Sequence, residues 1–129
     1  MAIFYKKIQR NPINPEIPKK WYICLKSIRE VKEKEISRKI SEETILKPKE
    51  VELVLHYFQK KVIEELIDGK TVTLADLGTF MLTATSCGTD TRDEAGPSLI
   101  KKLNIRFLPS RSFRKVIRKI QLLPVEKMK

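Results

Sequence analysis

The sequence predicts a small α+β protein. The chain has 129 residues, which suits one domain with a modest extension. Segments rich in β-branched and aromatic residues lie near the N-terminus and in the second half, and residues 31–68 between them have apolar side chains at helical spacing. We expect an N-terminal β-hairpin-like extension over 1–29, a main domain over 30–122 and a C-terminal tail over 123–129.

The N-terminal extension is predicted to be a strand–loop–strand unit. Residues 3–9 and 21–26 are rich in aromatic and β-branched side chains, which favour strands. The segment between them, RNPINPEIPKK, contains three prolines. Proline lacks a backbone donor and favours extended geometry in the residue before it, so we expect a stiff loop.

Two helices are predicted next. Over residues 31–44, Ile36 and Ile40 are four apart among charged residues, which indicates a helix with a narrow apolar stripe. The second helix begins at Pro48, a favoured first helical residue, and ends at Gly69, a common C-terminal stop. Its stripe is too wide for one short partner helix, so we expect a second subunit to cover part of it. The apolar residues of this helix are Val51, Leu53, Val54, Leu55, Tyr57, Phe58, Val62, Ile63, Leu66 and Ile67.

A bent three-stranded meander and a last helix complete the predicted order. TVTL and TFMLTATS indicate two strands that meet at residues 76–78, where Gly78 permits a backbone conformation that other residues resist. A polar loop, CGTDTRDEAGPS, precedes a returning strand in LIKKLNIRFLP. After Pro109, SRSFRKVIRKI predicts a short basic amphipathic helix with Ser110 or Ser112 as its cap.

The formal charge of +11 is concentrated at the two ends of the chain. Residues 1–29 carry seven basic side chains and one acid, residues 99–129 carry ten and one, and residues 30–98 are slightly acidic. Solubility alone would not require this asymmetry. It predicts a polyanionic partner, with nucleic acid favoured and an anionic membrane as the alternative. Between residues 100 and 120 there is no acid, and the cations are Lys101, Lys102, Arg106, Arg111, Arg114, Lys115, Arg118 and Lys119.

The sequence does not favour an enzyme. Cys24 and Cys87 fit no metal-binding spacing and are expected to be free thiols, and His56 is the single histidine. The chain has no phosphate-binding loop and no Ser/His/Asp set, so we expect no cofactor, no metal and no small-molecule substrate. It also lacks a bilayer-length apolar run and a secretion signal, so we expect a cytoplasmic protein that does not associate with membranes.

The predicted sheet and last helix carry two motifs, GKTVTLADLGTF at residues 69–80 and FLPSRSFR at residues 107–114. They follow the patterns G-x-x-V-x-L-x-x-[FL]-G-[TS]-F and F-x-P-x-[KR]-x-[LF]-[KR] of the bacterial histone-like DNA-binding proteins, HU and integration host factor (IHF). The resemblance to this family covers roughly residues 30–120. It looks closest to the HU-like branch with an N-terminal extension found in Bacteroidetes.

The resemblance implies an HU/IHF-like fold in an intertwined homodimer, with a β-arm on the sheet and the sheet and arms facing double-stranded DNA. It also implies a nucleoid-associated protein that binds duplex DNA with low sequence specificity and bends or compacts it. Two alternatives stay open. The chain is a structural or protein-interaction module that has lost arm-mediated bending, or it binds RNA in place of DNA.

The arm region departs from the family pattern. The family's arm tip carries Arg-Asn-Pro, whereas the arm here has Asp90, Asp93 and Glu94 around a lone Arg92, and phosphates repel acids. An Arg-Asn-Pro tripeptide does occur at residues 10–12, where chance is the simpler explanation and backbone contact without intercalation is the expected use. The predicted DNA-binding residues are the eight cations of residues 100–120, together with Arg92 and Arg10.

Overall fold

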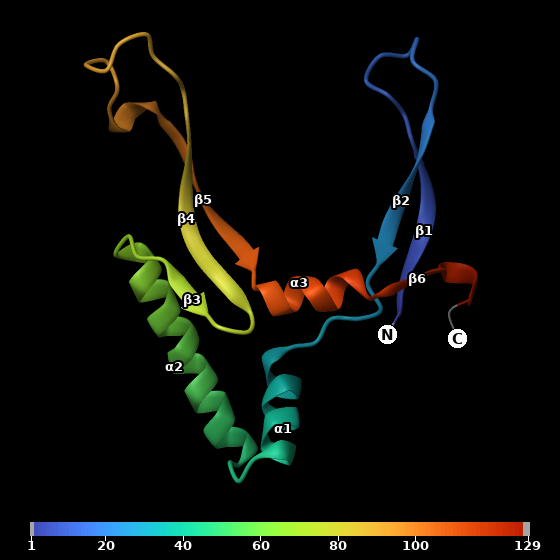
Figure 1. Ribbon diagram of the computed structural model, residues 1–129, viewed down its shortest axis with the longest axis vertical. Helices are drawn as coiled ribbons and strands as arrows, with labels where there is room; N and C mark the ends of the chain where they lie inside the picture. The colour runs from blue at the N-terminus through green and yellow to red at the C-terminus, as the bar shows by residue number, and fades with distance from the viewer. Residues whose placement is uncertain (1, 128–129) are drawn as a thin grey trace. The chain divides into compact units, whose positions relative to one another are not determined.

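The computed structural model of the protein describes residues 2–127, an α+β chain with three α-helices and two small β-sheets (Figure 1). The chain divides into two compact units. The terminal unit comprises residues 2–31 with 116–127, and the central unit comprises residues 32–115. Residues 128 and 129 of the expected tail lie outside the described residues. Within residues 2–127, no helix has the length and apolar character needed to cross a membrane.

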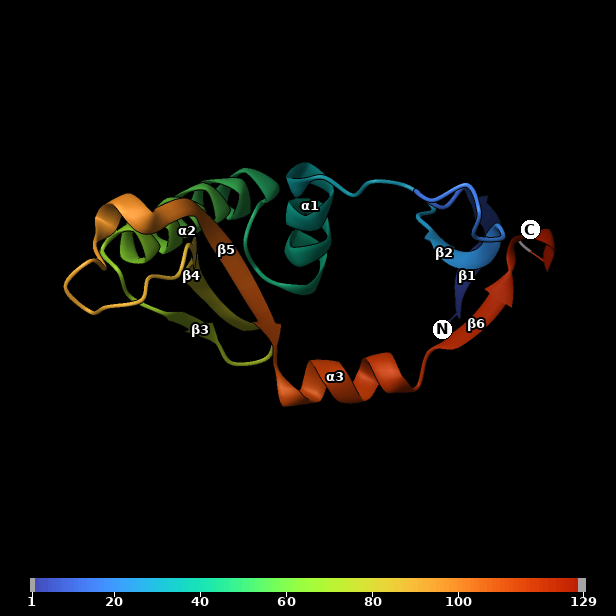
Figure 2. The same ribbon diagram turned by 90° about the horizontal axis from the view of Figure 1, so that it is seen from above.

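The terminal unit is a three-stranded sheet in the order β2-β1-β6. β1 (Ala2–Arg10) and β2 (Lys20–Lys26) pair antiparallel, which confirms the predicted strand–loop–strand unit. β6 (Gln121–Pro124) lies parallel to β1 (Figure 2), and a short 3₁₀ turn, η2 (Val125–Lys127), follows it. The sequence does not predict β6, because four residues ending in proline carry little strand signal and their partner is distant in sequence.

The central unit begins with a helical hairpin. α1 (Glu33–Glu43) and α2 (Pro48–Ile67) both lie where the sequence predicts helices. Pro48 occupies the first turn of α2, and the Lys47 backbone N–H donates to Glu50 Oε2 at 3.4 Å, so the start of α2 is capped. After α2 the chain passes through Gly69 with a φ of 84°, the conformation expected of a glycine stop.

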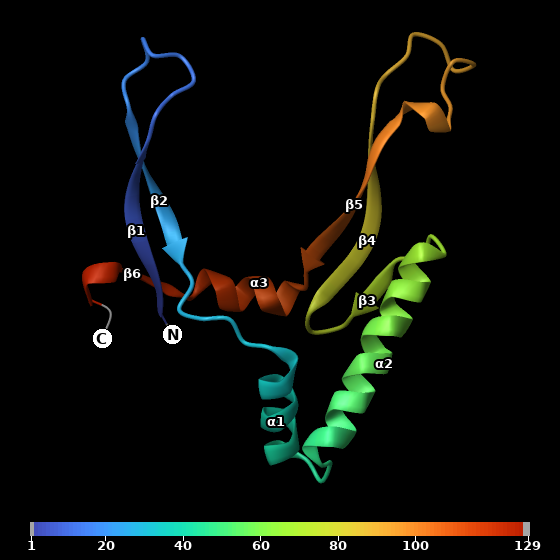
Figure 3. The same ribbon diagram turned by 180° about the vertical axis from the view of Figure 1, so that it is seen from behind.

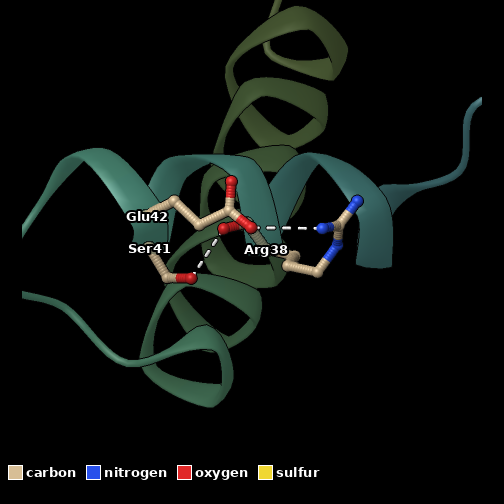
Figure 4. A network of polar contacts seen from close by, with 3 residues as sticks. All are labelled: Arg38, Ser41 and Glu42. Atoms are coloured by element: carbon tan, nitrogen blue, oxygen red, sulfur yellow. Dashed lines mark hydrogen bonds and ion pairs between the residues drawn. The ribbon is translucent and has the colours of Figure 1, made fainter.

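The exposed side of α1 carries local polar contacts (Figure 4). Arg38 Nη1 donates to Glu42 Oε1 at 3.1 Å, and Ser41 Oγ donates to the Arg38 carbonyl at 2.6 Å. An exposed ion pair one helical turn apart contributes about 0.3–0.5 kcal/mol. The stability of α1 therefore depends chiefly on its packing against α2.

The second sheet has the order β3-β4-β5 and is antiparallel throughout. Its strands are β3 (Val72–Leu74), β4 (Gly78–Ser86) and β5 (Ile100–Pro109), and β4 and β5 continue beyond β3 as a two-stranded ribbon (Figure 3). The loop at the end of the ribbon covers residues 87–99 and includes a 3₁₀ turn, η1 (Pro97–Leu99). The order of two helices, sheet and final helix is compatible with an HU-like fold.

Gly78 lies where β5 closely approaches the turn between β3 and β4. Its φ is 150°, and a Cβ built on it would overlap the Leu108 carbonyl oxygen and lie 2.7 Å from Phe107 Cε2 and 2.9 Å from Pro109 Cα. Glycine is therefore needed here both for the backbone conformation and for the space. The predicted bend at residues 76–78 is a full reversal, because β3 and β4 pair antiparallel across it.

Much apolar surface stays uncovered in a single chain. Among the described residues, Val51 and Leu66 are the buried apolar side chains. The accessible surface is 11600 Å², whereas two separate compact bodies of these lengths would expose about 8,500 Å². One chain therefore does not complete its core. The large apolar side chains exposed on α1, α2, β4 and β5 are Ile36, Leu53, Val54, Tyr57, Phe58, Ile63, Ile67, Leu82, Ile100, Leu103, Ile105 and Phe107.

Candidate nucleic-acid interface

The sheet of the central unit has one apolar and one polar face. The register pairs Phe80 with Phe107, whose rings lie 4.9 Å apart between centroids, and Leu82 with Ile105 on the same side. Side chains alternate along a strand, so the neighbouring positions belong to the other face. We call this other side the polar face because most of its residues are polar or charged. These are Thr73, Thr79, Thr83, Thr85, Lys102, Asn104 and Arg106, with the apolar Met81 and Leu108 on the same side.

The polar face combines cations with hydrogen-bonding groups. Lys102 and Arg106, both predicted as DNA-binding residues, share it with Asn104, whose Nδ2 donates to Thr85 Oγ1 at 2.9 Å. Lys101 lies at the irregularity where the register shifts beside Ser86. Asn104 and the threonines were not among the residues predicted to bind DNA. The recurrence of threonine at every second position near the end of β4 was the available signal.

α3 (Arg111–Arg118) begins directly after β5, at the position the sequence predicts. Ser110 is its cap, since the Phe113 N–H donates to Ser110 Oγ at 3.1 Å. Ser110 also joins the helix to the β3–β4 turn. Its Oγ donates to the Asp76 carbonyl at 2.7 Å, and its backbone N–H donates to the Leu77 carbonyl at 3.0 Å. The start of α3 is thus fixed to the sheet.

The cations of α3 lie on one side of the helix. Their spacing of three and four residues places them one turn apart, opposite the apolar Phe113, Val116 and Ile117. These cations are Arg111, Arg114, Lys115 and Arg118, and Lys119 follows in the turn after the helix. Within the described residues, no predicted cation on β5 or α3 forms an ion pair, whereas Arg38 and Lys61 each pair with a glutamate. The β5 and α3 cations are available to phosphates.

Two other predicted residues lie outside this group. Arg92 is in the loop at the end of the β4–β5 ribbon, where Asp90, Asp93 and Glu94 outnumber it. Arg10 ends β1 in the terminal unit, and its guanidinium carbon lies 5.3 Å from the centroid of the Tyr22 ring. Of the ten predicted residues, the structure places seven on β5 and α3, and Lys119 follows directly after α3.

We expect Ser110→Ala to lower the free energy of unfolding by about 1–2 kcal/mol, since it removes the cap of α3 and the bond to the Asp76 carbonyl. Urea unfolding followed by circular dichroism measures the change. Ser112→Ala is the matched control because its Oγ contacts only that of Ser110 among the described contacts, and it should cost less than about 0.5 kcal/mol. Equal stability of the two variants would contradict a structural role for Ser110.

Comparisons with known proteins agree with this architecture. The sequence model of one family, described as an HU domain fused to wHTH, Ig, or glycine-rich motif, matches residues 1–124. No curated protein matches the sequence. Among solved structures, a candidate bacterial DNA-binding protein from Bacteroides vulgatus aligns with a TM-score of 0.63 and 12% identity, over 99% of this chain and 51% of that chain. The chain thus spans about half the length of that structure, and the likeness shows a shared fold.

Proposed function

Since the chain belongs to the family of HU domains fused to wHTH, Ig, or glycine-rich motifs, we propose that it is a non-enzymatic architectural protein that binds duplex DNA as a homodimer with little sequence preference. It acts on the nucleoid in the cytoplasm and bends or compacts the DNA that it binds. The observation that carries this proposal is the polar face, where neither Lys102 nor Arg106 forms an ion pair within the described residues; α3, with its cations on one side, begins directly after β5.

The chemistry of this surface suits phosphate contacts better than base reading. Lysine and arginine neutralise phosphates, and threonine and asparagine donate hydrogen bonds to them. We assign phosphate neutralisation to the cations of β5 and α3, within the DNA-binding domain proposed over 30–122. Contacts of this kind depend little on sequence. The set is Lys101, Lys102, Arg106, Arg111, Arg114, Lys115, Arg118 and Lys119.

The homodimer is supported by the apolar surface that one chain leaves exposed. Val54, Tyr57 and Phe58 form an exposed apolar arc on α2 beside the buried Val51. Soluble monomers rarely expose large contiguous apolar patches. A second copy offers a complementary surface, because the same patch occurs on both chains of a twofold dimer. The dimer also doubles the number of phosphate contacts.

The acidic loop at the end of the β4–β5 ribbon supports a second candidate function. Asp90, Asp93 and Glu94 make this loop unfavourable for phosphates and suitable for a basic protein surface. In this case the fold is a protein-interaction module that has lost DNA binding through the arm. The absence of duplex binding at low salt, together with a co-purifying protein partner, would favour it over DNA binding.

A salt titration tests the proposed function. If the cations of β5 and α3 alone make about six to eight phosphate contacts per dimer, the logarithm of the affinity for a labelled duplex should fall with log salt at a slope of about −5 to −7 or steeper. Replacing Lys102 and Arg106 together by Gln removes up to four contacts per dimer. This should weaken binding about 10²- to 10³-fold at 0.15 M salt, equally for unrelated sequences.

The control removes the same charge elsewhere. Replacing Arg38 and Lys61 together by Gln deletes two cations that are already paired with Glu42 and Glu64, so the affinity should change by less than about threefold. A nearly flat salt response, or equal losses in the two double variants, would rule out the polar face as the DNA-binding surface. Preference for structured RNA over duplex DNA in competition would point to the RNA alternative.

A further inference from the structure

The loop between β1 and β2 carries an isoleucine with no packing partner. Ile13 is fully exposed. Such a side chain contributes no burial to the fold, since no apolar surface is removed from water. It is flanked by Pro12 on one side and by Asn14 and Pro15 on the other. A fully exposed apolar side chain on a proline-flanked loop is suited to insertion into a binding partner.

The loop forms a hydrogen-bonded turn directly after Ile13. The Ile17 N–H donates to the Asn14 carbonyl at 3.1 Å, and the Glu16 N–H donates to Asn14 Oδ1 at 3.0 Å. Three prolines restrict the backbone further. At the base of the loop, the Arg10 guanidinium lies over the Tyr22 ring. The prolines and this turn reduce the backbone freedom that would be lost on binding, which lowers the entropic cost of inserting Ile13.

The charges around this loop suit a polyanion. Arg10, Lys19 and Lys20 flank the loop, with Glu16 as the single acid within it. The loop at the end of the β4–β5 ribbon has the opposite balance, with three acids around Arg92. Of these two loops, the β1–β2 loop is therefore the one that phosphates would attract. The β1–β2 ladder, from Phe4–Lys26 to Arg10–Lys20, is about 20 Å long, so its tip can reach a groove.

We propose that the β1–β2 loop is a DNA wedge, which inserts Ile13 between base pairs of duplex DNA from the minor groove while Arg10, Lys19 and Lys20 neutralise the flanking phosphates. Insertion of an apolar side chain unstacks a base step and kinks the duplex. The minor groove is only about 6 Å wide in B-form DNA, which admits a single protruding side chain. This proposal rests on the proposed function, since it requires duplex DNA as the partner.

The test uses the full chain and a 30-base-pair duplex (about three helical turns) with donor and acceptor dyes at its ends and 2-aminopurine at a flexible central step. Replacing Ile13 by Ser should abolish most of the shortening of the end-to-end distance and most of the rise in 2-aminopurine fluorescence. Binding should weaken about tenfold. The salt slope should stay unchanged, because Ile13 carries no charge.

The matched control is Ile45→Ser. Ile45 is also fully exposed, and it lies in the turn between α1 and α2, where Lys47 is the single cation. This variant should bind and bend the duplex as the unmodified protein does. If Ile13→Ser and Ile45→Ser both behave like the unmodified protein while that protein binds and bends DNA, the wedge is wrong and the proposed function stands.

Two charge variants give independent readouts. Replacing Lys19 and Lys20 together by Gln removes up to four phosphate contacts per dimer and should make the salt slope less steep by about 2–4. Replacing Glu16 by Gln should tighten binding two- to threefold, roughly the effect of one exposed like charge, and this gain cannot arise from misfolding. No duplex binding by the unmodified protein would overturn the proposed function together with the wedge. Vesicle binding that depends on Ile13, with duplex binding unchanged, would overturn the wedge alone.

Discussion

Replacing Phe58 by Glu is expected to convert the proposed homodimer into a monomer. Phe58 is 42% exposed on α2, beside the exposed Val54 and Tyr57. By twofold symmetry, one substitution places two carboxylates in the shared interface, and each loses its hydration there. We expect a loss of about 4–6 kcal/mol, which raises the dimer dissociation constant about 10³- to 10⁴-fold. Sedimentation velocity over a concentration series measures this change.

The control for this variant is Gln59→Glu. Gln59 is exposed, adjacent in sequence and about 100° further around the same helix, so it adds the same charge outside the apolar arc. It should leave the dissociation constant unchanged. Duplex affinity should fall with Phe58→Glu, because a monomer holds half the phosphate contacts. A dimer of unchanged strength in Phe58→Glu would place the interface away from α2.

Replacing Gly78 by Ala is expected to have the largest effect on folding. The new Cβ would overlap the Leu108 carbonyl oxygen and approach Pro109 Cα, and both of these are backbone atoms that cannot rotate away. The φ of 150° adds strain for any residue with a side chain. We expect a loss of at least about 4 kcal/mol, which lowers the melting temperature by roughly 20 °C in a unit of this size. Thermal unfolding followed by circular dichroism measures it.

Gly96→Ala is the control, because a Cβ at Gly96 meets no atom within 4 Å and its φ is in the extended range. It should change stability by less than about 0.5 kcal/mol. If the Gly78→Ala and Gly96→Ala variants have the same melting temperature, the close approach of β5 to the turn has no energetic importance. An unfolded Gly78→Ala variant with an intact Gly96→Ala variant is the expected pair of results.

Local patterns were sufficient for most of the helices and strands. Pro48 and Gly69 marked the ends of α2, and Ser110 was one of the two predicted caps of α3. Each has the expected role in the structure, because capping depends on neighbouring residues. β6 was missed because its pairing with β1 is not encoded locally. The tight contact at Gly78 was equally hidden, since it depends on Leu108 and Pro109, which are distant in sequence.

Part of the candidate site could be predicted from the sequence. Alternation along the returning strand separated Lys102 and Arg106 from Leu103 and Ile105, and the structure keeps them on opposite faces. The acids around Arg92 were visible in the sequence, yet Arg92 was kept among the predicted DNA-binding residues; the structure places it in the acidic loop at the end of the β4–β5 ribbon. Charge counts did not identify Ile13, since its proposed role rests on its full exposure in the β1–β2 loop.

The parallel pairing of β1 with β6 has a consequence for how the chain reaches its native state. A ribosome synthesises β1 and β2 early, and β6 emerges only after residues 27–120 have been made. Until then the nascent hairpin has an unsatisfied edge, and an isolated hairpin is marginally stable in water. We therefore expect the terminal sheet to form last, after the central unit has folded and shortened the effective loop that joins the two strands.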